Sequence, residues 1–445
     1  MSADIKKVLV KDDRLNCTDQ LTYAVMKGGQ SMNPASFQAV SQSNSSHVYN
    51  VQCPSEQTLV DRRVLWTSTV ILKIDGTAPA GQFLMNYGIT DALAPFPLHQ
   101  LVNVMNCVIN NNSVSLNVRD VLPALIRFHD RRELARYNGY APTAFDSYNA
   151  YADGVGAINN SLGAYQNTAD NDLTPRGAWV LDGYGTDTNA SNSTMPVSTG
   201  GAQTIYVKFT VAEPLLISPW ISCHPQSNNQ AFYGIQNMTF TFSMGDASRV
   251  WRTASTFAKT VAIQSFTNSQ LLFNFLTAHP SDLLPSRNIV GYTEFPRYIT
   301  AFGASLASQT SFSFKSSSLQ LNQIPDKLIM FVRKSMSSQT SADSDSFLAL
   351  SGTNPLSINF NNVSGILSSA SQYDLYRYSI ENGSNQSWYE FSGNANLANA
   401  STGAGRKVPT VGAMLVLEFG KDIPLQEDYY APKKIWAQEQ PVMVC

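Results

Sequence analysis

Residues 205–211, with the sequence IYVKFTV, alternate strictly between apolar and polar side chains. Successive side chains of a β-strand point to opposite faces, so this pattern predicts a strand with one face toward a core. The apolar row consists of Ile205, Val207, Phe209 and Val211. A buried strand of this kind needs partner strands elsewhere in the chain.

Similar patterns recur along the chain. Residues 64–74 and 238–244 alternate in the same way, and shorter apolar runs lie at residues 261–263, 312–314, 328–332, 358–360 and 414–417. We expect turns at Asp75-Gly76 and Asn382-Gly383, because these pairs favour tight hairpins. One amphipathic helix is expected over residues 117–137, and its charged end at 129–133 has the pattern of a solvated helix end. The sequence therefore predicts an all-β fold with few short helices.

The length of 445 residues exceeds what one sandwich of roughly 100 residues needs. We expect two tandem eight-stranded β-sandwiches, over residues 56–250 and 251–425, with a break near residues 248–251. Residues 1–55 are polar and are predicted to form an N-terminal arm, and residues 426–445 a C-terminal tail. Residues 145–203 carry almost no strand pattern and are predicted to be a long surface loop, ordered against something such as a neighbouring subunit.

Only 14% of the residues are charged and the formal net charge is −2. A typical soluble domain has roughly 25% charged residues. The charges of the arm are mixed in sign, so neither the body nor the arm predicts nucleic-acid binding. The first residues lack an apolar segment of signal-peptide length, so we expect synthesis in the cytoplasm or nucleus of a cell, without secretion.

No group of residues predicts chemistry, and we expect no catalytic, cofactor-binding or metal site and no enzymatic activity. Asp343 and Asp345 could bind a cation only weakly, because no further oxygen ligands are patterned around them. Cys223 and His224 are adjacent and would face opposite ways on a strand. The Gly-rich residues 402–407 are interpreted as a hairpin loop. The cysteines and histidines are widely spaced, at Cys17, Cys53, Cys107, Cys223 and Cys445 and at His47, His99, His129, His224 and His279.

Four segments resemble the double jelly-roll major capsid proteins of the adenovirus, tectivirus, virophage and polinton-like virus lineage. They are residues 209–220 (FTVAEPLLISPW), 231–238 (AFYGIQNM), 324–333 (IPDKLIMFVR) and 419–425 (FGKDIPL). The resemblance implies two jelly rolls in one chain and a structural role in a virion. It further implies a homotrimeric, pseudo-hexagonal capsomer that self-assembles into an icosahedral shell around the genome. Neighbouring capsomers, penton and minor capsid proteins, an inner membrane or a host receptor would be its contacts.

Other functions remain open from the sequence. A penton or spike protein, or another single jelly-roll capsid component, would also be mainly β. A carbohydrate-binding or receptor-binding β-sandwich would use exposed aromatic, Asn and Asp side chains. A glycan-cleaving enzyme would need two carboxylates roughly 5–10 Å apart across a cleft, and the sequence offers no candidate pair.

Overall fold

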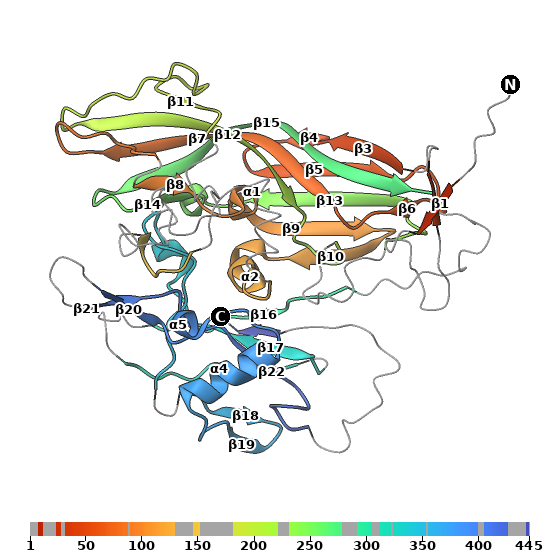
Figure 1. The fold of residues 1–445 in the computed structure, drawn as a ribbon, viewed down its shortest axis with the longest axis vertical. Coiled ribbons are helices and arrows are strands. Elements are labelled where there is room, and N and C mark those ends of the chain that lie inside the picture. Colours follow the sequence, from red (N-terminus) through yellow and green to blue (C-terminus); the bar gives the residue numbers. More distant parts are fainter. Residues whose placement is uncertain are drawn as a thin grey trace.

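The computed structural model describes residues 8–11, 24–27, 32–87, 90–129, 146–151, 181–220, 231–277, 292–303, 311–321, 324–352, 355–398, 405–425 and 442–444. Figure 1 shows two parts, one built from residues up to 277 and the other from residue 292 onward. The first part contains the long strands. The second contains short strands and the longest helix described.

Eight strands build the first part. They are β3 (Met32–Gln38), β5 (Ser46–Gln52), β7 (Leu65–Thr77), β9 (Val102–Ile109), β10 (Asn112–Leu116), β12 (Ala202–Pro214), β13 (Asn237–Met244) and β15 (Lys259–Leu276). The first of these pairs with the eighth, the second with the seventh, the third with the sixth and the fourth with the fifth, all antiparallel. The resulting sheets have the orders β12-β7-β15-β3 and β10-β9-β13-β5. This connectivity is a jelly roll, in which one long antiparallel ribbon is folded over into two facing sheets.

Shorter strands extend this framework. β4 (Ser41–Gln42), β6 (Leu59–Val60) and β11 (Gly183–Gly185) add to the two sheets, and β8 (Asp91–Leu93) pairs with β14 (Trp251–Thr253). β1 (Val8–Lys11) pairs with β2 (Ala24–Lys27). The helices α1 (Pro97–Leu101) and α2 (Val118–Leu125) lie on the side of the sandwich that faces the second part (Figure 1).

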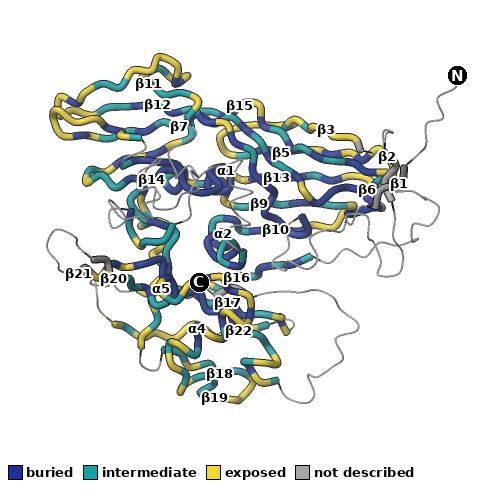
Figure 2. The backbone as a smooth tube through the Cα atoms, in the orientation of Figure 1, coloured by how far each residue is buried: buried dark blue, intermediate teal, exposed yellow. Residues whose placement is uncertain are grey.

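The apolar row of β12 points into the space between the two sheets, as its alternation predicted. Ile205, Val207 and Phe209 are fully buried, and they pair in register with Ile74, Leu72 and Val70 of β7. Phe240 and Phe242 of β13 face them from the other sheet and are also fully buried. Burying each such side chain contributes roughly 1.5–3 kcal/mol. Figure 2 shows the buried residues concentrated between the sheets and the exposed ones on the outer turns.

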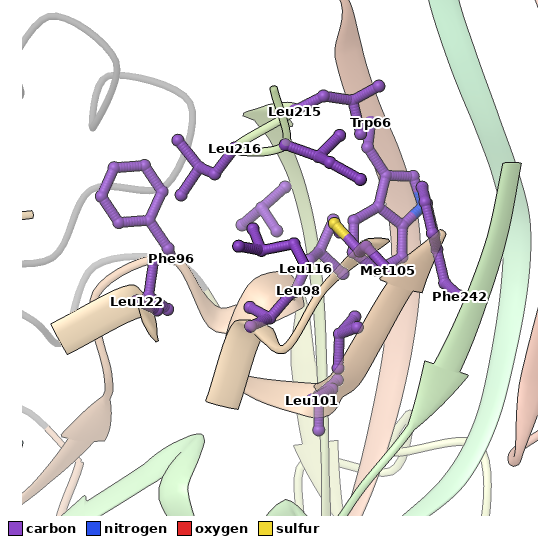
Figure 3. Packing of buried hydrophobic residues seen from close by; sticks show 14 of the residues in the cluster. Trp66, Phe96, Leu98, Leu101, Met105, Leu116, Leu122, Leu215, Leu216 and Phe242 are labelled. Atoms are coloured by element: carbon purple, nitrogen blue, oxygen red, sulfur yellow. The ribbon is translucent and has the colours of Figure 1, made fainter. Parts of the chain in front are cut away.

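Trp66 lies at the centre of this core. Its ring packs against Phe242 at 4.8 Å between centroids, and its indole N–H donates to the Tyr49 hydroxyl at 2.9 Å. Leu98, Leu116 and Met105 surround it from α1, β10 and β9, as Figure 3 shows. A buried indole N–H needs such a partner, because an unpaired buried donor costs roughly 1–3 kcal/mol.

The limits of the first sandwich differ from the predicted residues 56–250. Residues 32–52, placed in the arm from sequence, supply β3 and β5, which are the first and second strands of the jelly roll. The predicted break near residue 250 is followed by β15, which pairs with β7 and β3 of the same sheet. The apolar pattern of β3 is weak because it is an edge strand whose side chains from Asn33 onward stay exposed or half-exposed.

One predicted turn is wrong, and the other is a turn that ends a helix and does not join a hairpin. Asp75 and Gly76 lie inside β7, where a Cβ on Gly76 would come within 2.7 Å of the Leu84 Cδ1 atom. A Cβ would also lie 3.0 Å from the Ala258 carbonyl oxygen, so glycine suits this crowded position inside the strand. Asn382-Gly383 ends a helix: Gly383 has φ +104°, and the Ser384 N–H donates to the Ser379 carbonyl, as in a Schellman motif.

The second part has one four-stranded sheet of order β16-β23-β17-β22, built from β16 (Arg297–Tyr298), β23 (Val442–Val444), β17 (Lys327–Met330) and β22 (Leu415–Glu418). The pairs β18 (Ile358–Phe360) with β19 (Val363–Ile366) and β20 (Asn394–Ala398) with β21 (Gly405–Pro409) complete the described strands. Helix α4 (Gln372–Glu381) packs on β22 through Leu375, and α5 (Trp388–Phe391) adds Phe391 to the same core. β23 falls in the predicted tail, and residues 426–441 lie outside the described residues.

Of the predicted helix over residues 117–137, α2 accounts for Val118–Leu125, and residues 130–137 lie outside the described part of the chain. The predicted strand at residues 312–314 is extended but has no strand partner among the described residues. No helix in the described ranges is long and apolar enough to cross a membrane.

The revised arm gives a direct test. Deleting residues 1–31 leaves all eight strands of the jelly roll, so we expect the chain to remain folded, with circular dichroism and thermal unfolding close to those of the full chain. Deleting residues 1–55 removes β3 and β5, and we expect loss of cooperative unfolding of the first part. Equal thermal unfolding of the two truncated chains would contradict the strand assignment.

Candidate functional site at the interface of the two parts

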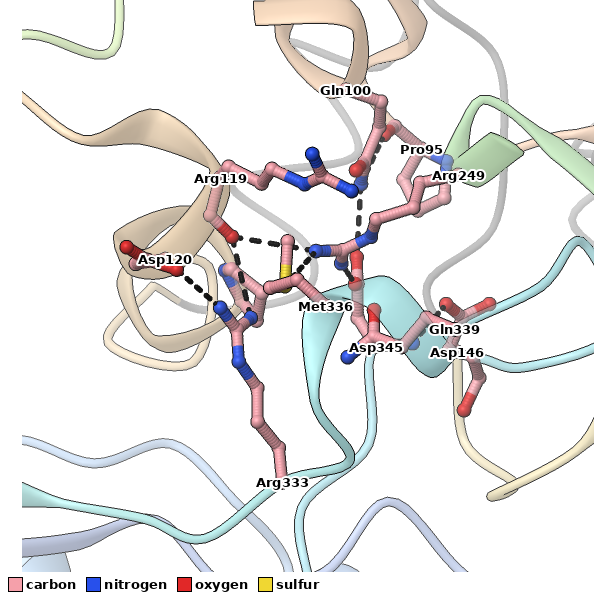
Figure 4. A network of polar contacts seen from close by, with 12 residues as sticks. Pro95, Gln100, Arg119, Asp120, Asp146, Arg249, Arg333, Met336, Gln339 and Asp345 are labelled. Carbon is pink, nitrogen blue, oxygen red and sulfur yellow. Dashed lines mark hydrogen bonds and ion pairs between the residues drawn. The ribbon is translucent and has the colours of Figure 1, made fainter. Parts of the chain in front are cut away.

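The two parts meet at buried charged side chains, which Figure 4 shows converging below α1 and beside α2. Asp120 sits in the first turn of α2, whose apolar residues face the core of the first part. Its side chain is 8% exposed and accepts from Arg333 Nη2 at 2.5 Å. Arg297 forms a second ion pair with it. One carboxylate of the first part is thus held by two arginines of the second.

A second pair runs in the opposite direction. Arg249, at the end of the 3-10 helix η4 (Ala247–Arg249), forms an ion pair with Asp345 of the second part, and both side chains are less than a tenth exposed. Gln100 of α1 donates to the same carboxylate at 2.9 Å. The backbone carbonyl of Arg119 accepts from both Arg249 and Arg333 at 3.3 Å. We call Gln100, Asp120, Arg249, Arg333 and Asp345 the interdomain network.

Interactions between the charges of this network are strong because the side chains are buried away from water. Burial, followed by the nearby Arg333 and Arg119 charges, lowers the pKa of Arg249 to about 9, so Arg249 remains charged at neutral pH. A buried guanidinium requires a carboxylate close by, and Asp345 meets that requirement. Removing one partner from such a buried pair typically costs about 3–5 kcal/mol.

Contacts other than ion pairs surround the interdomain network. Arg127 lies over the ring of Phe347 at 4.2 Å and donates to the Asp345 carbonyl at 2.6 Å. Asn385 of the second part donates through its side chain to the Phe128 carbonyl at 2.7 Å. The Asn385 N–H also donates to the Arg127 carbonyl at 2.8 Å, so the backbone just after α2 is held at two carbonyl groups. The two parts are therefore joined by hydrogen bonds as well as by ion pairs.

Residues 146–151, from the predicted surface loop, form another part of the interface. The Asn149 N–H donates to the Pro409 carbonyl at 3.1 Å, and the Ser344 N–H donates to the Asn149 carbonyl at 3.2 Å. Asp146 pairs with Arg252 at 3.0 Å. This piece of the loop is therefore ordered against the second part of its own chain. Residues 152–180, which include most of its aromatic side chains, lie outside the described residues.

Asp343 and Asp345, weighed from sequence as a weak cation pair, have separate protein partners. Asp343 pairs with Lys334 at 2.9 Å, while Asp345 pairs with Arg249. The described residues contain no group of three or more His, Cys, Asp or Glu side chains arranged to hold a metal ion.

One pair of residues has the arrangement of a catalytic base and its orienting carboxylate. His99 Nδ1 lies 2.6 Å from Glu213 Oε2, and both side chains are fully buried. Glu213 also accepts from the backbone N–H groups of Leu98 and His99 at 2.8 and 3.0 Å. His99 Nε2 accepts from the Leu216 N–H at 3.3 Å, so both ring nitrogens are occupied. The pair fastens α1 to the end of β12 and offers no free base to a substrate.

Asp91 and Lys259 form a second buried pair. Lys259 Nζ contacts Asp91 Oδ1, and the Trp251 indole N–H donates to the same oxygen at 3.1 Å. Burial lowers the pKa of Lys259, and Asp91 acts against that shift. The pair connects the start of β15 to β8. Sequence reasoning missed both pairs because their members lie more than a hundred residues apart in the chain.

His47 of β5 is buried between the sheets. Its Nδ1 lies 3.3 Å from the Tyr49 hydroxyl and 3.2 Å from Ser269 Oγ, and its ring meets Phe266 edge-on at 4.4 Å. Burial lowers its pKa to about 4. The histidine is therefore neutral at pH 7 and serves as a core side chain.

The remaining sequence candidates are structural or undescribed. Cys53 and Cys107 are buried free thiols, and burial raises their pKa values to about 11 and about 12. Gly405–Pro409 is β21, which pairs with β20. Outside the described residues lie Cys17, Cys223, Cys445, His224, His279 and residues 402–404.

A jelly roll and a second β part, here joined by buried ion pairs, occur together in double jelly-roll viral capsid proteins, the class to which the comparisons assign the chain. Two family models match the chain. The one described as Sputnik virophage major capsid protein 1st domain covers residues 3–276, and the one described as major capsid protein V20 C-terminal domain covers residues 295–437. The chain belongs to the family of virophage major capsid proteins.

Individual relatives agree. Putative capsid protein V20 of Sputnik virophage is 30% identical over an alignment 449 positions long, which covers 95% of this chain and 71% of that protein. A chain in the cryo-EM structure of the Sputnik virophage matches with a TM-score of 0.72 at 27% identity, covering 95% of this chain and 83% of that one. The mavirus major capsid protein matches in fold, with a TM-score of 0.63 at 14% identity, over 88% of this chain and 79% of that one. The chain is thus a structural component of a virion capsid, and self-association into a shell is part of that role.

The interdomain network predicts unequal effects for two neighbouring carboxylates. Asp345→Asn leaves Arg249 buried without its ion-pair partner, and we expect a loss of about 3–5 kcal/mol in the free energy of unfolding, measured by urea denaturation. Asp343→Asn is the matched control, since its exposed pair with Lys334 contributes about 0–1 kcal/mol. Similar losses in both variants would show that the buried pair does not hold the two parts together.

His47 predicts a loss of stability at acid pH. Its pKa is about 4 in the folded chain and 6.5 in the unfolded chain, so the neutral ring stabilises the fold above pH 6.5. That contribution is lost as the pH falls from 6.5 toward 4, by about 2–3 kcal/mol at pH 4.5. The free energy of unfolding of His47→Gln, measured between pH 7 and pH 4.5, should fall correspondingly less than that of the wild type. Parallel pH profiles would exclude His47 as the source.

Proposed function

We propose that this chain forms a homotrimeric, pseudo-hexagonal capsomer, and that these capsomers tile an icosahedral shell enclosing the genome. The observation that carries the proposal is the rigid connection between the two parts. Buried ion pairs in both directions, together with backbone bonds from residues 146–151, fix one part against the other. Three such two-part chains around a threefold axis present six bodies, and a closed cyclic arrangement of this kind is common among homo-oligomers.

The low charge of the chain supports close packing between copies. Many of its charges are used inside the chain, as in the pairs Asp91–Lys259 and Asp120–Arg333. The surface left for neighbours therefore carries few ions that would have to be desolvated on contact. Obligate interfaces of large area are typically apolar in this way.

Further contacts belong to the same proposal. Of the predicted loop, residues 186–200 between β11 and β12 would face neighbouring subunits or a host receptor. Residues 1–31 and residues 426–441, which precede β23 of the chain's own sheet, would reach adjacent capsomers, penton and minor capsid proteins or an inner membrane. The chain would bind no specific nucleic-acid sequence and would have no enzymatic role.

The proposal is tested by the mass and shape of the purified chain. Light scattering coupled to size exclusion should give three times the 48.7-kDa chain mass, and electron microscopy should show a hexagonal outline. A stable monomer or dimer at micromolar concentration would overturn the homotrimer. A trimer that never forms shells or flat hexagonal arrays would overturn the tiling.

A further inference from the structure

The last described strand of the chain, β23, lies inside the sheet of the second part. Its three residues pair in parallel with β16 on one side and with β17 on the other. Within the described ranges, β16 pairs with no strand other than β23, so the order β16-β23-β17 exists only when β23 is in place. Figure 1 shows this end of the chain beside β16 and, in that view, below α2.

The strands on either side of β23 lead to the two arginines that bind Asp120. Arg297 is the first residue of β16, and Arg333 follows the end of β17 by three residues. Met443 of β23 is the register partner of Arg297 on one side and of Ile329 on the other. Neighbouring strands lie about 4.8 Å apart, so the insertion of β23 sets β16 about 10 Å from β17. One short strand therefore determines the spacing of two side chains that meet on a single carboxylate.

Asp120 depends on this spacing although it belongs to the other part. It lies in the first turn of α2, and it pairs with Arg333 through Oδ1 and with Arg297 through Oδ2. A carboxylate bound at both oxygens is fixed in orientation as well as in position. The Arg297 side chain is 39% exposed, so packing alone does not hold it toward Asp120, and the position of β16 decides whether it reaches the carboxylate.

We propose that β23 is a strap that completes the interface of the two parts: by pairing between β16 and β17, it holds Arg297 and Arg333 at the spacing at which both bind Asp120. The Arg249–Asp345 pair still joins the parts when β23 is undocked, so release of the strap loosens the interface without separating them. β23 follows every other described strand in the sequence, so the interface is completed only after all of them have been synthesised. The inference concerns a single chain and is independent of the proposed homotrimer.

Hydrogen exchange tests the strap from the first part of the chain. Coupling between two sites is reciprocal, so a change at Asp120 must alter the stability of β23. Asp120→Asn removes the charge that both arginines bind, and we expect the amides of residues 442–444 to exchange about tenfold faster. The measurement is mass spectrometry with electron-transfer fragmentation, and the amides of β7 in the same molecule report any global unfolding.

Asp246→Asn is the matched control for this experiment. Asp246 is also a carboxylate of the first part, but it is half-exposed and its partner is Arg119, at 3.6 Å. Exchange at residues 442–444 should stay at the wild-type rate in this variant. The strap is excluded if Asp120→Asn leaves that exchange unchanged, or if Asp246→Asn accelerates it equally.

A backbone substitution tests the coupling in the other direction. Met443→Pro removes an N–H from a strand that has neighbours on both sides, where proline is disfavoured, whereas Met443→Val keeps the N–H. We expect Arg297→Gln to lower the urea midpoint of unfolding in the wild type and in Met443→Val. In Met443→Pro it should have no further effect, because both changes act on the same contact.

An effect of Arg297→Gln that is equal in all three backgrounds, including no effect in any of them, would overturn the proposal. If Met443→Pro prevents folding of the second part, the exchange experiment still decides, because Asp120→Asn changes no residue of that part. If Asp120→Asn instead accelerates exchange throughout β7, the urea series decides.

Discussion

The pairing of β15 with both β7 and β3 is the constraint on which the first jelly roll depends. β15 is the eighth strand of the ribbon and lies between the first and the third, so the sheet closes only when it is in place. Its register shifts twice, between Ile263 and Ser265 and between Thr267 and Gln270. Asn268 has φ +52° at the second shift. These bulges bend one long strand along the whole sheet.

The second bulge also organises the core. It turns Ser269 inward, where its hydroxyl lies 2.5 Å from that of Tyr49 and accepts from the Trp66 indole at 3.2 Å. His47 shares the same group of hydrogen bonds. Three large side chains with polar tips can therefore be buried together, because a small hydroxyl from the bulged strand satisfies them. Without that hydroxyl, Tyr49, Trp66 and His47 would each lose one hydrogen bond of the buried group and would depend on one another.

The same bulges explain which strands could be predicted from sequence. β7, β12 and β13 keep an almost unbroken period of two, and their patterns located them to within a few residues. In β15 the buried positions change from Val261 to Phe266 and then to Ser269 and Leu271, so the period is interrupted twice. That loss of period made residue 250 resemble a boundary. β5 buries His47 together with Tyr49 and Val51, and a histidine in the apolar row hid its alternation.

The interdomain network could not have been predicted, for a different reason. Asp120 and Arg333 lie 213 residues apart. No local sequence pattern predicts an ion pair that forms only where two distant parts of the chain meet. A charged residue in a chain with 14% charge looks like a surface residue until its burial is known. Composition still predicted self-association, since a low fraction of charged residues is typical of a surface that other subunits cover.

Buried ion pairs and apolar contacts differ in how strongly they fix the geometry of a subunit. Ion pairs such as Arg249–Asp345 add little net stability compared with apolar packing, but they allow only one relative position of the two parts. A shell built from many copies needs that single geometry, because a small angular error in each subunit accumulates around a closed ring. Apolar packing is less directional than ion pairing. Directional contacts inside the chain therefore suit a subunit whose shape must be fixed before it associates.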